Sequence, residues 1–106
     1  MYSNAGDKFK RTLTQNAAMH LYFRELAEAF NSAGLDVEEA LSNPIDLPWS
    51  EVLVKELIWH KVQRSVCDVE STAKLDTAQV GEIYEIINRF TAQKFGIHVM
   101  FPNEER

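Results

Sequence analysis

Arg11-Thr12-Leu13-Thr14-Gln15-Asn16 opens the stretch that decides the fold. It places a basic residue and a capping signal before one long amphipathic run that continues to Ala33. Thr12 and Gln15 have capping-box spacing, in which a hydroxyl and an amide satisfy N–H groups at a helix start. Apolar residues then recur at intervals of four and three, which predicts one stripe along a helix: Met19, Phe23, Leu26, Phe30 and Ala33. Gly34 is a natural residue to end that helix.

Two further long helices carry similar signals. Ser50 is the expected cap of a helix that fades near Val66-Cys67, because serine favours helix starts and apolar spacing follows it. Its predicted core face holds Val54, Leu57, Ile58 and Val62, widened by Leu53 and Trp59, while Lys55, Glu56, Gln63 and Arg64 are expected to face solvent. Asp76 and Gln79 form a second capping box, and the helix after them is expected to reach about Phe95 and stop at Gly96.

The connections complete the predicted architecture. A short helix is expected from Asp36, followed by a loop in which Pro44 and Pro48 prevent both helix and strand. Residues 97–102 are extended and apolar, and we expect them to pack across the helices because no second strand is evident. The expected fold is a small all-α bundle of three main helices plus one short helix, with an extended apolar C-terminal tail.

Composition limits the class of protein. The chain has 106 residues, 45% of them hydrophobic and 25% charged, which fits one globular domain. We place that domain at residues 11–102, with a flexible basic arm at 1–10 and a frayed end at 103–106. No apolar run predicts a membrane span or a secretory signal. A single cysteine, Cys67, cannot form an internal disulfide, so a reducing cytoplasm is the expected compartment.

Charge is unevenly distributed along the chain. The formal net charge is −5, which disfavours indiscriminate binding to phosphate backbones. Residues 35–47 carry four acids and no base: Asp36, Glu38, Glu39 and Asp46. A local basic patch is still expected at residues 8–11.

The sequence lacks the patterns of an enzyme site. His20, His60, His98 and Cys67 do not pair at the spacings that bring two metal ligands to one side of an element. There is no nucleophile-elbow motif and no glycine-rich phosphate loop. We therefore predict a protein without catalytic activity, metal or cofactor.

Two surfaces are candidates for binding nucleic acid. Lys8, Phe9, Lys10 and Arg11 alternate basic and aromatic side chains before a helix start, which suits phosphate contact and stacking. Gln15, Asn16 and His20 follow on one side of that helix. Trp59, His60, Lys61 and Arg64 form a second aromatic and basic cluster. The alternative interpretation is a solubilising arm and a core tryptophan.

A protein partner is the other hypothesis. An exposed Trp49 in the proline loop, or the apolar residues Val99, Met100 and Phe101, would provide a docking or dimer surface. Packing within the chain is the alternative for both segments.

Two stretches resemble the phage NinB (Orf) recombination-protein family. Residues 11–16 resemble its R-S-L-x-Q-N segment at a helix start, and Ser71-Thr72-Ala73-Lys74-Leu75 resembles its S-T-x-x-hydrophobic segment. The similarity covers residues 11–97, in the same order and with a tryptophan-bearing helix between the motifs. Only ten residues precede the first motif here, so the expected form is a shortened one without the family's N-terminal β segment.

The resemblance implies a phage-encoded mediator that binds single-stranded DNA in the host cytoplasm and assists recombinase loading. It also implies a homodimer and contact with the host single-strand-binding protein. The DNA-binding residues it suggests are Lys8, Lys10, Arg11, Gln15, Asn16, His20, Ser71, Thr72 and Lys74. If the first and last helices pack side by side or antiparallel, the polar residues of both motifs converge. The alternative role for these residues is capping of backbone groups.

Two other classes stay open. A non-enzymatic adaptor or inhibitor of a host protein (a defence, replication or single-strand-binding protein) fits the acidic connector and the apolar tail. A purely structural phage component is the third class.

Overall fold

The structure, a computed structural model, describes residues 13–37 and 47–102. Helix α2 spans Leu13–Ser32, and one continuous helical rod follows from α4 (Glu51–Val54) through the π-helical turn η1 (Lys55–Trp59) to α5 (His60–Cys67). The 3-10 turn η2 (Thr72–Lys74) precedes α6 (Thr77–Phe95). These ranges contain no strand, and the predicted all-α fold with three main helices is confirmed.

Some predictions concern residues outside these two ranges. The basic arm at 1–10, most of the short helix expected from Asp36, and the chain end at 103–106 lie outside the described residues.

The helix ends follow the local signals. The Ser50 hydroxyl accepts a hydrogen bond from the Leu53 N–H at 3.2 Å. The capping box of α6 is complete, because Asp76 accepts from the Gln79 N–H at 2.8 Å and the Gln79 side chain accepts from the Asp76 N–H at 3.0 Å. Gly34 and Gly96 adopt left-handed backbone angles, φ 78° and 69°, which glycine allows without steric cost.

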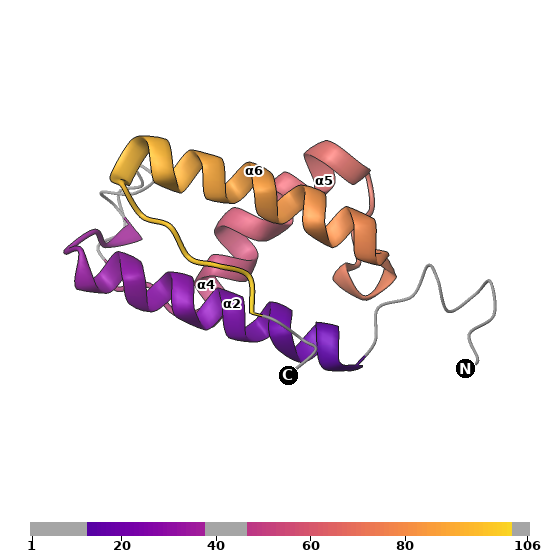
Figure 1. Ribbon diagram of the computed structural model, residues 1–106, viewed down its shortest axis with the longest axis horizontal. Helices are drawn as coiled ribbons and strands as arrows, with labels where there is room; N and C mark the ends of the chain where they lie inside the picture. The colour runs from indigo at the N-terminus through magenta and orange to yellow at the C-terminus, as the bar shows by residue number, and fades with distance from the viewer. Residues whose placement is uncertain (1–12, 38–46, 103–106) are drawn as a thin grey trace.

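Helices α2 and α6 run side by side in the same direction, and the α4–η1–α5 rod crosses behind them (Figure 1). Contacts at both ends establish the parallel arrangement. Near the helix starts, the Thr77 hydroxyl donates to the Gln15 side-chain oxygen at 3.4 Å. Near the helix ends, the rings of Phe30 and Phe95 meet edge to face with centroids 5.7 Å apart.

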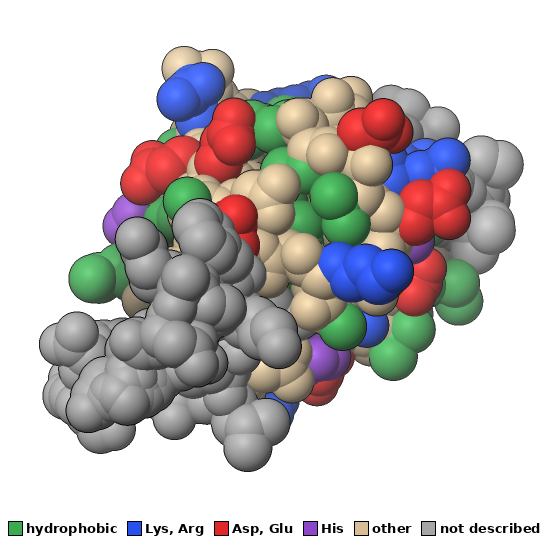
Figure 2. Space-filling model, turned by 90° about the vertical axis from the view of Figure 1, so that its right-hand side faces the viewer, with side chains coloured by type: hydrophobic (Ala, Val, Ile, Leu, Met, Phe, Trp, Pro, Cys, Tyr) green, Lys and Arg blue, Asp and Glu red, His purple; other side chains and the backbone are tan. Residues whose placement is uncertain are grey.

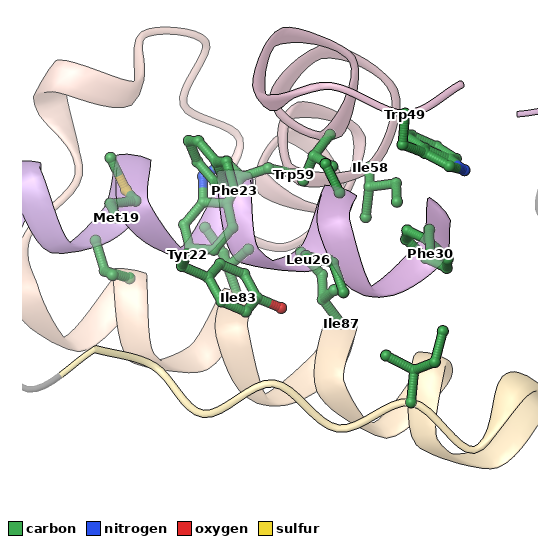
Figure 3. Packing of buried hydrophobic residues seen from close by; sticks show 14 of the residues in the cluster. Met19, Tyr22, Phe23, Leu26, Phe30, Trp49, Ile58, Trp59, Ile83 and Ile87 are labelled. Atoms are coloured by element: carbon green, nitrogen blue, oxygen red, sulfur yellow. The ribbon is translucent and has the colours of Figure 1, made fainter. Parts of the chain in front are cut away.

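The core lies where the three helices meet, and Figure 3 shows their side chains pointing toward one another. At its centre, Trp59 packs edge to face on Tyr22 and Phe23, with ring centroids 6.1 and 5.1 Å apart. All three side chains are fully buried. Edge-to-face aromatic pairs each add roughly 0.5–1.5 kcal/mol beyond their area burial, so this cluster joins the rod to α2.

Trp49 is part of this core, so of the two interpretations of this residue, packing within the chain is confirmed and an exposed docking tryptophan is excluded. Its side chain is only 3% exposed and stacks on Phe30 with centroids 4.9 Å apart. Asn31 fixes the backbone there. Its side-chain oxygen accepts from the Trp49 N–H at 2.8 Å, and its amide donates to the Trp49 carbonyl at 2.9 Å. These two hydrogen bonds hold Trp49 in place against the core.

The C-terminal segment packs across the helices, as predicted. It runs back between α2 and α6 after Gly96 (Figure 1). The Thr91 hydroxyl donates to the Ile97 carbonyl at 2.9 Å, and the Tyr84 hydroxyl donates to the Val99 carbonyl at 2.9 Å. Phe101 then lies 5.7 Å from the ring of Tyr22.

The π-helical turn changes which side of the rod faces inward. Val54 and Trp59 are both fully buried although they are five residues apart, the spacing of a π turn. Gln63 follows four residues later and is also fully buried. The prediction that Gln63 faces solvent is therefore wrong, because the extra residue in the turn rotates the rest of the rod. Leu57 and Val62, predicted for the core face, are only half-buried.

Replacing Asn31 tests what holds Trp49 in the core. Asn31→Ala removes both hydrogen bonds to Trp49, and we expect the free energy of unfolding to fall by about 1–2 kcal/mol. Urea denaturation followed by tryptophan fluorescence measures it. Ser32→Ala, at the exposed neighbouring position, is the matched control and should change stability by less than about 0.5 kcal/mol. Equal effects of the two substitutions would contradict the proposed role of Asn31.

Tyr22 supplies a second prediction. Its buried hydroxyl makes no hydrogen bond with the residues that the structure describes. Burial first, and then the nearby Tyr84, raise the pKa of Tyr22 above its ordinary value of 10.0. The folded state thus favours the protonated phenol, and its contribution to stability is complete below pH 10.0 and declines above it.

Tyr22→Phe should leave stability at pH 8 unchanged or raise it by up to about 1 kcal/mol, and should weaken the loss of stability above pH 10. Tyr84→Phe is a comparison for stability at pH 8 only, because burial also raises the pKa of Tyr84. It loses the hydrogen bond to the tail and should cost about 1 kcal/mol at pH 8. Urea unfolding at both pH values measures the effects, and an unchanged alkaline loss in Tyr22→Phe would refute the assignment.

Candidate nucleic-acid interface

The two sequence motifs lie at the same end of the bundle. Residues 13–16 form the first turn of α2, and 71–75 lead into the start of α6, which begins beside α2. Figure 1 shows both helix starts at the right-hand end. Lys8, Lys10 and Arg11, the basic residues expected to contact phosphate, lie outside the described residues.

Gln15 faces inward at this end. Its side chain is only 5% exposed, and its oxygen accepts the hydroxyl hydrogen of Thr77 at 3.4 Å. A buried amide left without partners costs roughly 1–3 kcal/mol, so this contact stabilises the junction of α2 and α6. Asn16, the next residue, is half-buried. The structure thus gives Gln15 a structural role, and Asn16 is the more accessible of the two.

The second motif, residues 71–75, also contains a residue that contacts other parts of the protein and others that face solvent. The Thr72 hydroxyl donates to the side-chain oxygen of Gln63 at 3.0 Å, and the Gln63 amide donates to the Val69 carbonyl at 2.7 Å. Thr72 therefore ties η2 to the rod. Ser71 and Lys74 are exposed, and Lys74 forms no ion pair with the described residues.

His20 belongs to a different contact. Its Nδ1 lies 2.9 Å from a Glu51 carboxylate oxygen, and the Arg24 Nε lies 3.8 Å from the other oxygen. The His20 ring also meets Phe23 edge to face at 5.5 Å. These contacts join α2 to α4, so His20 is directed to the rod, away from the second motif.

The second aromatic and basic cluster, residues 59–64, is only partly accessible to a nucleic acid. Trp59 is fully buried, as its predicted place on the core face requires, and it cannot stack on a base. His60 Nε2 lies 2.6 Å from the Glu70 carbonyl oxygen. Lys61 and Arg64 remain exposed, and they line a hollow of about 370 Å³ together with Ser65, Asp68 and Glu70. The two carboxylates oppose an anion there.

Figure 2 views the molecule from the side on which α2 and α6 begin, and the described residues visible there include both acidic and basic side chains. Binding of a polyanion at this end therefore depends on individual groups such as Lys74 and on the basic residues that precede α2.

Other site chemistry finds little support in the described part of the chain. No three His, Cys, Asp or Glu side chains gather there as a metal site requires. Burial raises the pKa of the Cys67 thiol, with further contributions from Glu82 and Asp76, which disfavours the nucleophilic thiolate. No helix there is long and apolar enough to cross a membrane.

Sequence reasoning missed Gln63 and Thr77, the partners of the two motifs. Thr77 follows the Asp76 cap and carries no pattern of its own. Gln63 is turned inward by the π-helical turn, which local spacing does not reveal. A polar residue four positions after a buried tryptophan was the available signal, and it is a weak one.

A double-mutant cycle tests the contact between Thr72 and Gln63. Thr72→Val should lower the free energy of unfolding by about 1 kcal/mol, and Gln63→Leu by about 1–3 kcal/mol, because each leaves a buried partner unsatisfied. The double variant should lose about 1 kcal/mol less stability than the summed losses of the two single variants, as measured by urea denaturation. Ser71→Ala is the matched control, and we expect it to change stability by less than about 0.5 kcal/mol. Strict additivity would show that the two side chains do not interact.

Comparison of this chain with models of known protein families, with curated proteins and with solved structures gives no match in any of the three.

Proposed function

We propose that this protein binds single-stranded DNA as a non-catalytic accessory factor in phage recombination or repair, in the manner of a NinB-like mediator. The observation that carries the proposal is the contact between Gln15 and Thr77. It brings together the starts of α2 and α6, and with them two polar motifs that lie about sixty residues apart in the sequence.

The proposed interface combines three kinds of contact. Lys8, Lys10 and Arg11 supply positive charge immediately before α2, and Phe9 among them supplies a stacking surface. Exposed Ser71 and Lys74, with half-buried Asn16, offer hydrogen-bond donors and one further positive charge. The parallel starts of α2 and α6 add the positive ends of two helix dipoles. Gln15 and Thr72 act indirectly, by holding the two segments together.

Such an interface would recognise the backbone of a strand more than its bases. Phosphate contacts give affinity without sequence preference, as a mediator that loads a recombinase on any strand requires. In this proposal the protein acts in the host cytoplasm as a homodimer and contacts the host single-strand-binding protein. If light scattering at micromolar concentration gives the mass of one chain, the prediction of a homodimer is refuted.

Fluorescence anisotropy with a labelled oligonucleotide at low salt tests DNA binding. We expect a dissociation constant in the micromolar range that weakens with salt by about 0.7 log units per decade for each neutralised phosphate. The triple variant in which Lys8, Lys10 and Arg11 are each changed to Gln should lower the steepness of the salt dependence by about two. Lys74→Gln alone should lower it by about 0.7.

Arg89→Gln is the matched control, because Arg89 is exposed near the far end of α6, and it should leave the slope unchanged. No binding at tens of micromolar, or equal effects of all these variants, would refute the proposal.

An adaptor or inhibitor of a host protein is the second candidate. Its initial support has weakened, since Trp49 is buried and Val99 and Phe101 pack against the core. A pull-down from host lysate with nuclease treatment separates the two functions, because a protein partner survives the nuclease and a DNA bridge does not.

A further inference from the structure

A second surface lies away from the proposed DNA interface. An open groove of about 290 Å³ separates the rod from α6, and its lining is almost entirely apolar: Leu57, Ile58, Val62, Ile86, Ile87 and Phe90, with Lys61 at its edge. Phe90 is 36% exposed, and Leu57, Val62 and Ile86 are half-buried. These side chains leave apolar surface in contact with water.

The π-helical turn builds one wall of this groove. Leu57 and Ile58 both belong to η1. Such turns are rare and occur frequently at functional positions. The distortion that buries Trp59 therefore also places two apolar side chains opposite α6.

We propose that this groove binds an amphipathic α-helix of a partner protein, which inserts two apolar side chains one turn apart and carries acidic residues beside them. The length of each wall, about one helical turn, sets the number of inserted side chains at two. Each wall includes a pair four residues apart, Leu57 with Lys61 and Ile86 with Phe90, so each pair spans one helical turn. The volume is at the lower limit for small-molecule sites, about 300 Å³, and suits side chains better than a cofactor.

The backbone explains why the occupant is a helix. Both walls are helical, so their main-chain N–H and C=O groups are paired within the walls themselves. An extended peptide would enter a nearly apolar groove with its own backbone groups unsatisfied, at a cost of roughly 1–3 kcal/mol for each buried group. A helix satisfies those groups internally and presents apolar side chains at the required spacing.

The charges explain why the occupant is acidic. Lys61 borders the groove, and the Lys94 ammonium lies 5.8 Å from the centre of the Phe90 ring. Neither lysine forms an ion pair with the described residues. A second copy docked groove to groove would place these lysines against their own equivalents, and such like-charge contacts oppose binding. Carboxylates beside the inserted side chains would instead pair with them.

Titration of the isotope-labelled full chain with designed helical peptides, followed by NMR, tests the proposal. The probe is an alanine-based helix with two leucines four residues apart and flanking glutamates. We expect shift changes concentrated at the groove and a dissociation constant of about 1 mM or tighter. A second peptide carries lysine in place of every glutamate, and a third carries glutamine in place of both leucines. Both should bind at least about fivefold more weakly.

Variants of the protein locate the site. Phe90→Ala should weaken binding about tenfold, and the double variant Lys61→Glu and Lys94→Glu about fivefold, with the fold of each checked by circular dichroism. Val52→Ala is the matched control, because Val52 is 65% exposed on the same rod and does not line the groove. Lys74→Glu should leave peptide binding unchanged while it weakens DNA binding, so the two proposals fail independently.

Three results would overturn this inference. The first is the absence of shift changes at the groove with the acidic peptide. The second is equal binding of the lysine peptide. The third is a shift of the groove resonances with protein concentration alone, which would identify a second copy as the occupant.

Discussion

One extra residue in the middle helix determines how the three helices fit together. The step of five residues from Val54 to Trp59 keeps both side chains in the core, where a regular helix would turn one of them outward. Trp59 then reaches Tyr22 and Phe23 of α2. The same turn directs Gln63 inward and Leu57 toward α6. The turn thereby makes possible the aromatic contacts that join the rod to α2.

The sequence predicted the parts of the fold that local interactions determine. Both Ser50 and Asp76 cap helices at the expected positions, and both Gly34 and Gly96 end them, because each signal acts within a few residues. The burial of Trp49 depends on Asn31, eighteen residues earlier, and no local pattern contains that contact. Gln63 was misplaced for a related reason, since hydrophobic spacing assumes a regular helix throughout.

The candidate site was predictable in position and not in detail. A polar residue at a helix start serves equally for capping or for binding, and the sequence does not distinguish the two roles. The structure separates them by burial. Gln15 and Thr72 face protein partners, while Ser71 and Lys74 face solvent. The partners of these two side chains, Thr77 and Gln63, come from other segments of the chain.

The packing of the tail bears on when this protein can fold. Phe101 covers the ring of Tyr22, and Tyr84 holds the Val99 backbone, so the core between α2 and α6 is closed by residues that are synthesised after α6. Chains emerge from the ribosome with their N-terminal residues first. Helix α2 must therefore wait, with its apolar stripe uncovered, until α6 and the tail have left the exit tunnel. The uncovered stripe of α2 is thus exposed to chaperones and proteases until that segment has emerged.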